Sequence, residues 1–328
     1  MKRRIVTYSP SMTITVTHDC PKRCLYCGFR TDHEGLISQE NVRRALDQAR
    51  VFGAIEILIM SGEEVEKLPH IRAQGKERGF KTFVDFVYSV CETILDHGFL
   101  PHTNIGILTY EELAQLREVN ASMGLMLENV DTGFARKVHP QKEIRDRIRT
   151  IEEAGRLKIP YTSGILIGMG ESVESRFESL RVLADLQKQY GHLQEIILQN
   201  YVPNRRSRLP WRPVSLEEYK ELIACSKEIM PDVAVQIPPN LNPYWLDLVE
   251  VGAEDLGGIS PEGDHVNIDN PWERVTVYEE ALAKKGYQLS KRLPVYEKYY
   301  PTVLSFPGKI GKCLSTHIFQ VLNGSQSF

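Results

Sequence analysis

Apolar and polar residues alternate near the start of the chain. Met12, Ile14 and Val16 are separated by threonines, and this period of two predicts a half-buried strand that ends just before three closely spaced cysteines. From Ser38 the apolar residues recur at helical spacing until Gly53, and the segment after it, EILIMS, predicts a second strand. The cysteines are therefore expected in the loop after the first strand.

The alternation of strand and helix patterns continues along the chain. Further strands are predicted in FLPHTNIG, SMGLMLE, YTSGILIGM, QEIILQNYV and VAVQIPPNL. Helices are predicted over residues 77–97, after the capping box at Thr109, over 143–157 and 175–191, and after Ser215. Six or seven such repeats predict an α/β fold with a parallel sheet, either doubly wound or curled into a full or partial barrel. Functional groups then belong in the loops after the strands' C-terminal ends.

The chain has 328 residues, and its periodic part is expected to form one domain over residues 1–300. The last residues, 301–328, fit no periodic pattern and are expected to be a tail of uncertain structure. No apolar run approaches the roughly 18 residues of a membrane-spanning helix, and the N-terminus lacks a signal-peptide pattern. A cytoplasmic protein with no membrane partner is therefore expected.

The net charge and the scattered cysteines bear on which partners and cross-links the protein has. The formal net charge is −3 and both signs are interleaved, so no nucleic-acid partner is expected. The arginine-rich segment NRRSRLPWR is interpreted as a solvated loop. Cys91, Cys225 and Cys313 are far apart, which argues against a disulfide framework and favours buried or idle thiols.

The other three cysteines, Cys20, Cys24 and Cys27, form a compact CxxxCxxC trio. A structural zinc site wants four ligands, which His18 could complete, whereas a redox dithiol would use one CxxC pair and leave Cys20 unexplained. A 4Fe-4S cluster held by three thiolates would keep one iron open for a small molecule. The residues alone leave these alternatives open.

The trio, with Tyr26 before its last cysteine and its place after the first strand, resembles the radical S-adenosylmethionine superfamily. The resemblance implies a partial or near-complete TIM-like barrel with a C-terminal extension. It also implies a 4Fe-4S cluster on the three cysteines, whose open iron binds S-adenosylmethionine. An electron from the cluster then yields a 5′-deoxyadenosyl radical, so the cofactor carries the difficult chemistry.

Two further motifs are similar to motifs of this superfamily. SGEE, at 61–64, resembles its Gly-Gly-Glu motif, so the resemblance implies cofactor contacts for Ser61, Gly62 and Glu63; an acidic helix start is the alternative. GILIGMGE, at 164–171, resembles a motif that packs against adenine; an ordinary tight turn is the alternative. The resemblance implies cofactor contacts for a further set: Tyr26, Glu128, Gly164, Gly168, Glu171 and Gln199.

Within the superfamily, several segments between about residues 4 and 296 together resemble the CofG family of deazaflavin synthases. They are VTYSPS, PHTNIGILTYEEL, SMGLMLE, IPPNL and GGISPEGDHVN. The arginine-rich loop and Leu256, where a tryptophan is expected, depart from that family's pattern. CofH-type enzymes are expected to have CAF at the third cysteine, whereas this chain has CGF.

The CofG resemblance implies a lyase in deazaflavin coenzyme biosynthesis. Its substrate would be 5-amino-5-(4-hydroxybenzyl)-6-(D-ribitylimino)-5,6-dihydrouracil, made by a CofH-type partner enzyme. The adenosyl radical would abstract hydrogen, the substrate radical would close the central ring, and release of ammonia and loss of a second electron would leave 7,8-didemethyl-8-hydroxy-5-deazariboflavin. An external one-electron donor of the ferredoxin or flavodoxin type is also implied.

Such a reaction needs groups that give and take protons, and these should lie at the C-terminal ends of strands. The candidates are His102, Glu128, Asp264 and His265. A turn-stabilising role for His102 is the alternative, and Asn240, in IPPNL, could contact a uracil edge or merely end a strand. Two other functions stay open: another radical enzyme (CofH-type, menaquinone-pathway or biotin-synthase-like), or a zinc-binding protein that is no enzyme.

Overall fold

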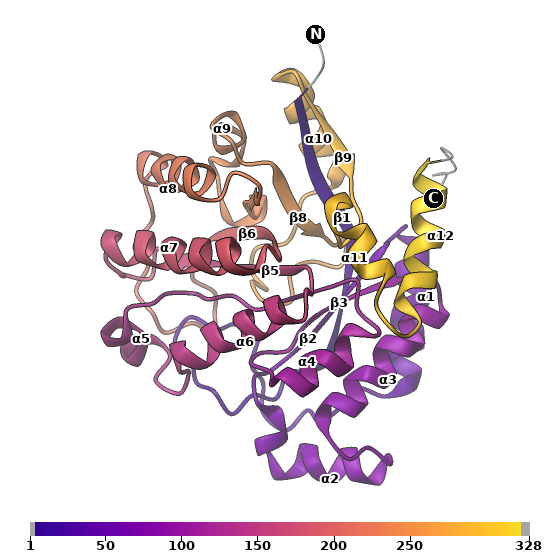
Figure 1. Cartoon of the computed structure of the whole chain (residues 1–328). Helices are drawn as coiled ribbons and strands as arrows, with labels where there is room; N and C mark the ends of the chain where they lie inside the picture. The colour runs from indigo at the N-terminus through magenta and orange to yellow at the C-terminus, as the bar shows by residue number, and fades with distance from the viewer. Residues whose placement is uncertain (1–3, 323–328) are drawn as a thin grey trace.

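A closed barrel of eight parallel strands forms the body of the protein in the computed structural model, which describes residues 4–322 and, at 321 and 322, the backbone alone (Figure 1). The strands are β1 (Arg4–Thr17), β2 (Glu56–Ser61), β3 (Leu100–Asn104), β4 (Ser122–Gly124), β5 (Tyr161–Ile167), β6 (Leu193–Asn200), β7 (Ala234–Gln236) and β8 (Asp255–Ile259). The barrel closes because β1 pairs in parallel with both β8 and β2. The expected TIM-like architecture is confirmed.

Strand β1 is long enough to hold a ninth strand outside the barrel. Its first residues, Arg4 to Tyr8, pair with β9 (Tyr287–Lys291), and its last residues, from Ser11 to Thr17, pair with β2. In Figure 1 this first half of β1 extends beyond the barrel together with β9.

Helices surround the barrel. They are α1 (Gln39–Val51), α2 (Pro69–Glu77), α3 (Phe83–Asp96), α4 (Tyr110–Arg117), α5 (Thr132–Val138), α6 (Ile144–Arg156), α7 (Val173–Tyr190), α8 (Leu216–Ile229), α9 (Trp245–Glu250), α10 (Val275–Lys284), α11 (Tyr300–Leu304) and α12 (Ile310–Leu322). The predicted caps are present: Ser38 caps α1, and Thr109 and Ser215 form capping boxes with glutamates three residues later. No helix in this described part is long and apolar enough to cross a membrane.

The predicted helix over 77–97 is wrong at its start. The helical conformation is interrupted at Gly79, whose φ is +86°. Helix α3 begins only after Thr82, which forms a capping box with Asp85. Helix α2 precedes the break and was not predicted. The segment SMGLMLE is a strand over three residues only, and Glu128 at its end makes an isolated bridge to Ile165.

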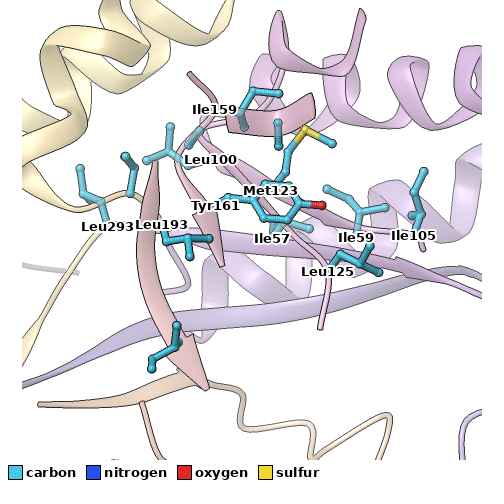
Figure 2. Packing of buried hydrophobic residues seen from close by; sticks show 14 of the residues in the cluster. Ile57, Ile59, Leu100, Ile105, Met123, Leu125, Ile159, Tyr161, Leu193 and Leu293 are labelled. Carbon is cyan, nitrogen blue, oxygen red and sulfur yellow. The ribbon is translucent and has the colours of Figure 1, made fainter. Parts of the chain in front are cut away.

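The core lies inside and around the barrel, where apolar side chains of successive strands meet. Figure 2 shows Met123 and Tyr161 in the middle of this cluster, with Ile57 and Leu100 beside them. All four are almost fully buried. Parallel strands covered by helices are buried on both faces, which explains their nearly continuous apolar composition.

The segment after β9 plugs the N-terminal end of the barrel. Arg292 pairs with Asp255, the first residue of β8, through Nε–Oδ2 (2.6 Å) and Nη2–Oδ1 (2.9 Å). Its Nη2 also lies 2.8 Å from Glu195 Oε2 on β6. The Pro294 carbonyl accepts a hydrogen bond from Ser122, the first residue of β4. These bonds tie the plug to three strands.

Part of the segment expected to be a tail of uncertain structure is helical. Residues 301–322 contain most of α11 and all of α12, and α12 packs against α11 and near β3. His317 Nε2 contacts the Gly98 carbonyl oxygen at 2.9 Å, which links α12 to the turn before β3. Residues 323–328 of that segment lie outside the described part of the chain.

Candidate active site

A cavity of about 350 Å³ runs through the barrel from the cysteine loop to the Arg292 plug. Eleven of the predicted site residues line it: Cys20, Cys24, Tyr26, Cys27, Ser61, Gly62, Glu63, His102, Glu128, Gln199 and Asp264. Gly164, Gly168, Glu171 and His265 are not among its lining residues. The fold therefore brings together the loop after β1 and residues on, or directly after, five other strands: β2, β3, β4, β6 and β8.

The cysteine loop is held by the buried carboxylate of Asp19. This carboxylate accepts hydrogen bonds from the amides of Glu34 (3.2 Å) and Gly35 (2.7 Å), and it contacts His70 Nε2 at 2.9 Å. Burial alone would raise the pKa of Asp19, but these hydrogen bonds outweigh burial and lower it. The loop is thus anchored by an ionised side chain directly before Cys20.

The three thiols of this loop are free and half-buried. Burial raises the pKa of Cys20 and raises that of Cys24 to about 11. A bound cation would have to stabilise their thiolate forms at neutral pH, as iron and zinc both do. Three soft sulfur donors on one short loop fit an iron-sulfur cluster, because each cysteine binds a separate iron.

The geometry gives less support to a zinc site completed by His18. His18 Nδ1 lies 2.7 Å from Glu34 Oε2, and its ring packs on Phe29 with centroids 4.8 Å apart. Within residues 4–322, no group of three or more His, Cys, Asp or Glu side chains is arranged to hold a single metal ion.

The predicted SGEE motif packs directly on the cysteine loop. A Cβ atom at Gly62 would lie 2.2 Å from the Asp19 carbonyl oxygen and 2.6 Å from Cys20 Cβ, so a larger residue cannot be accommodated there without a shift. Glu63 is buried and accepts a 2.6 Å hydrogen bond from Arg147 Nη1. The carboxylate of Glu63 therefore lies at the cavity mouth, beside the cysteines.

Glu128 is the centre of a buried charge network at the same mouth. It accepts hydrogen bonds from Lys142 Nζ (2.6 Å) and the Tyr26 hydroxyl (2.5 Å), and Arg147 Nη2 lies at 3.1 Å. Burial would raise the pKa of Glu128, but Lys142 and Arg147 outweigh burial and hold it well below its ordinary value. Glu128 is thus an anion at neutral pH, which suits ligand positioning better than proton transfer.

His102 was expected at the C-terminal end of its strand, but it lies deeper in the barrel, halfway along β3. The Ser122 hydroxyl donates its one hydrogen to the Pro294 carbonyl (2.6 Å), so its 2.7 Å contact with His102 Nδ1 has the imidazole as donor. Burial lowers the pKa of His102. The side chain is therefore neutral at pH 7, with Nε2 as a free acceptor at the cavity.

The late loop holds the other two acid–base candidates. Asp264 accepts four hydrogen bonds, from the Val266 amide (2.8 Å), the Asn267 amide (2.8 Å) and the side-chain amides of Asn267 and Asn240 (3.0 Å each). His265 Nδ1 instead contacts Thr15 Oγ1 at 3.2 Å. Asp264 shapes the loop and touches the cavity, whereas His265 is tied to β1.

The GILIGMGE segment forms the strand-to-helix turn after β5. The Glu171 carboxylate accepts hydrogen bonds from the backbone amides of Gly168 and Met169, at 2.8 Å each, and from Arg176 Nε at 2.6 Å. Gly164 sits so close to β6 that a Cβ would lie 2.2 Å from the Ile197 carbonyl oxygen. These residues stabilise the turn, and nothing in their contacts tests the expected contact with adenine.

Several residues of the cavity were not predicted from the sequence. They are Lys22, Lys142, Arg147, Glu195 and Arg292. For Arg147 a signal exists: it is on the apolar face of its helix, between Ile144 and Ile151 at helical spacing. A charged residue on a buried face needs a partner. The other four occupy ordinary polar positions and carry no comparable signal.

Known proteins resemble this chain in sequence and in fold. The family model described as Radical SAM superfamily matches residues 14–183. Proteins named 7,8-didemethyl-8-hydroxy-5-deazariboflavin synthase, from Methanothermobacter thermautotrophicus and Archaeoglobus fulgidus, are each 42% identical over 90% of this chain and 92% of their own length. The crystal structure of HydG, a maturase of the FeFe hydrogenase, is 17% identical and covers 95% of this chain and 69% of its own, with a TM-score of 0.71. That likeness concerns the fold alone.

Proposed function

Because this chain belongs to the radical SAM superfamily and, within it, to the 7,8-didemethyl-8-hydroxy-5-deazariboflavin synthases, we propose that it forms the deazaflavin chromophore by radical chemistry. Ring closure releases ammonia, so the enzyme is a carbon–nitrogen lyase. The observation that carries the proposal is one cavity that joins the three cysteines to buried polar groups inside a closed barrel.

Cys20, Cys24 and Cys27 would hold a 4Fe-4S cluster, with S-adenosylmethionine on its open iron. When bound, this pair supplies the 5′-deoxyadenosyl radical that abstracts hydrogen from the substrate. The carboxylate of Glu63 and the backbone at Ser61 and Gly62 would bind the ammonium of S-adenosylmethionine. Each of these residues lines the cavity beside the cysteine loop.

The network around Glu128 would bind the ribose and orient the cofactor. Glu128 is held by Lys142, Arg147 and Tyr26, so its free acceptor capacity points along fixed directions. Gln199, at the end of β6, lines the cavity and would add a contact to cofactor or substrate. For Gly164, Gly168 and Glu171 we propose an indirect role, in which the turn positions backbone against adenine.

His102 is the proton acceptor that we propose for ring closure. Its Nε2 is unprotonated because Nδ1–H donates to Ser122. A neutral imidazole inside a cavity can take a ring proton at neutral pH. Of the two other candidates, Asp264 lines the cavity, but its carboxylate accepts four hydrogen bonds and would orient the late loop rather than protonate the leaving amine, and His265 does not line the cavity.

The substrate would come from a CofH-type partner enzyme and would carry a uracil ring, a ribityl chain and a hydroxybenzyl group. Hydrogen-bonding amides suit the first two groups, and Asn104, Gln236 and Asn267 line the cavity between its mouth and its floor. Sites of this kind exclude water and fix orientation with few polar contacts.

The test is anaerobic reconstitution with iron and sulfide, followed by S-adenosylmethionine, dithionite and the product of a CofH-type enzyme. Deazaflavin fluorescence and substrate-dependent 5′-deoxyadenosine are both expected, and both should vanish in Cys24→Ala. Cys225→Ala is the matched control, because Cys225 lies in α8 and does not line the cavity. Formation of 5′-deoxyadenosine without deazaflavin would assign a different substrate, and a colourless zinc protein would refute the radical chemistry.

A further inference from the structure

The loop between β6 and α8 carries four exposed arginines, Arg205, Arg206, Arg208 and Arg212, and Trp211, which is 52% exposed. The sequence suggests only a solvated loop, and no step of the proposed reaction uses these side chains. In the fold, however, these side chains lie next to a functional segment of the protein.

This loop lies against the outer side of the cysteine loop. The Leu25 carbonyl accepts a 2.6 Å hydrogen bond from the Arg208 amide, and the Leu25 amide donates to the Val138 carbonyl at the end of α5 (2.9 Å). Arg206 Nη1 donates to the Gly28 carbonyl at 3.1 Å. The arginine loop and α5 therefore flank the segment that carries Cys24 and Cys27.

Exposed cations from the three segments form what we name the basic surface: Arg23, Arg136, Lys137, Arg205, Arg206, Arg208 and Arg212. Among the described residues, one acidic side chain, Asp269, forms an ion pair with any of them, through Arg205 at 3.3 Å. Basic residues elsewhere are often paired, as Arg44 is with Glu40. These cations give this part of the surface a local positive charge, although the formal net charge of the chain is −3.

We propose that the basic surface is the docking site of a small acidic one-electron carrier protein. The inference rests on the proposed radical chemistry, which requires an electron from outside for a cluster at the cysteine loop. The cavity side of that loop is where S-adenosylmethionine and substrate would bind, so the outer side is the one left for a protein partner. Complementary charge speeds and orients such transient encounters, whose interfaces are small.

The probe is purified, oxidised flavodoxin, titrated by calorimetry into the reconstituted enzyme and into the cluster-free full-length chain. Binding should weaken with salt, and it should weaken at least about tenfold in R136E/R208E. Both side chains are exposed and have no ion pair in the described part of the chain. The matched control is R43E/K284E, which makes the same charge change at exposed positions of α1 and α10 and should bind as the native protein does.

A second measurement separates docking from damage to the site. With dithionite as the reductant, 5′-deoxyadenosine formation by R136E/R208E should match the native rate within about twofold, while the flavodoxin-driven rate falls with affinity. If charge reversal prevents folding, R136A/R208A replaces it, with a smaller loss of affinity expected.

Three outcomes would overturn the proposal. R136E/R208E binds flavodoxin as tightly as the native chain, or the control loses affinity equally, or a single-stranded oligonucleotide binds the basic surface while flavodoxin does not. Flavodoxin binding at this surface by a protein that forms no deazaflavin would leave the docking site standing and refute the assigned reaction instead.

Discussion

Arg147 joins two carboxylates of the site: its Nη1 lies 2.6 Å from Glu63 Oε2 and its Nη2 lies 3.1 Å from Glu128 Oε1. All three side chains are buried. The cation comes from α6, whereas the carboxylates follow β2 and β4. One guanidinium thus sets the relative position of two loops that are 65 residues apart in sequence.

Replacing Arg147 by methionine should therefore destabilise the fold. The negative charges of the two buried carboxylates would lose one of their counter-ions. Removing one partner of a buried ion pair lowers the free energy of unfolding by about 3–5 kcal/mol. Urea unfolding at pH 7 measures the loss. Arg149→Met is the control, because Arg149 is 55% exposed and should change the free energy of unfolding by less than about 0.5 kcal/mol. Equal effects of the two substitutions would refute a special role for Arg147.

Gly62→Ala should disrupt the cysteine loop. The new methyl group would lie 2.2 Å from the Asp19 carbonyl oxygen and 2.6 Å from Cys20 Cβ, so the loop must move. Iron bound per chain after reconstitution should fall severalfold, and the melting temperature should fall too. Gly75→Ala in α2 should leave iron binding unchanged, because nothing lies within 4 Å of its Cβ position and alanine favours helix. Normal iron content in Gly62→Ala would contradict the close packing.

His102→Gln should slow deazaflavin formation by roughly 10²–10⁴-fold while 5′-deoxyadenosine still forms, because it removes the proton acceptor and spares the cluster loop. The pKa of His102 is lowered by burial, so the basic form persists below the ordinary histidine range. The rate of deazaflavin formation by the native enzyme should not change with pH near 7, and it should decline only as the pH falls below about 6.5. Measured pH–rate profiles check this, and a decline centred above pH 7 would count against His102 as the base.

Glu195 should make the stability of the native protein depend on pH. Burial raises the pKa of this carboxyl from 4.5 to about 7, although Arg292 opposes the shift. A raised pKa stabilises the fold below pH 4.5, and this contribution is lost as the pH rises through 7. Relative to Glu195→Gln, the free energy of unfolding of the native protein should therefore decline over that range by roughly 1–3 kcal/mol.

Urea unfolding at a series of pH values tests the Glu195 prediction. The control is Glu174→Gln, at an exposed position in the first turn of α7. Its free energy of unfolding should change with pH in the same way as that of the native protein. A parallel curve for Glu195→Gln as well would show that the Glu195 proton is not linked to folding.

Local features of the chain were predictable from the sequence because they depend on neighbouring residues. The alternation before Thr17 specified β1, and the pairs Thr109–Glu112 and Ser215–Glu218 specified helix starts through hydrogen bonds three residues apart. The spacing of Cys20, Cys24 and Cys27 placed three thiols on one loop in any fold. Strand–helix alternation restricted the fold to a parallel α/β class.

Only the tertiary structure decided how distant residues meet. Closure of the barrel depends on β1 finding both β2 and β8, and periodicity does not encode which strands become neighbours. The counter-ions of Glu128, the tautomer of His102 and the Arg292 plug all depend on contacts between separate loops. Ion pairs and hydrogen bonds of this kind act over a few ångströms in space, at any separation in sequence, so a local pattern does not reveal them.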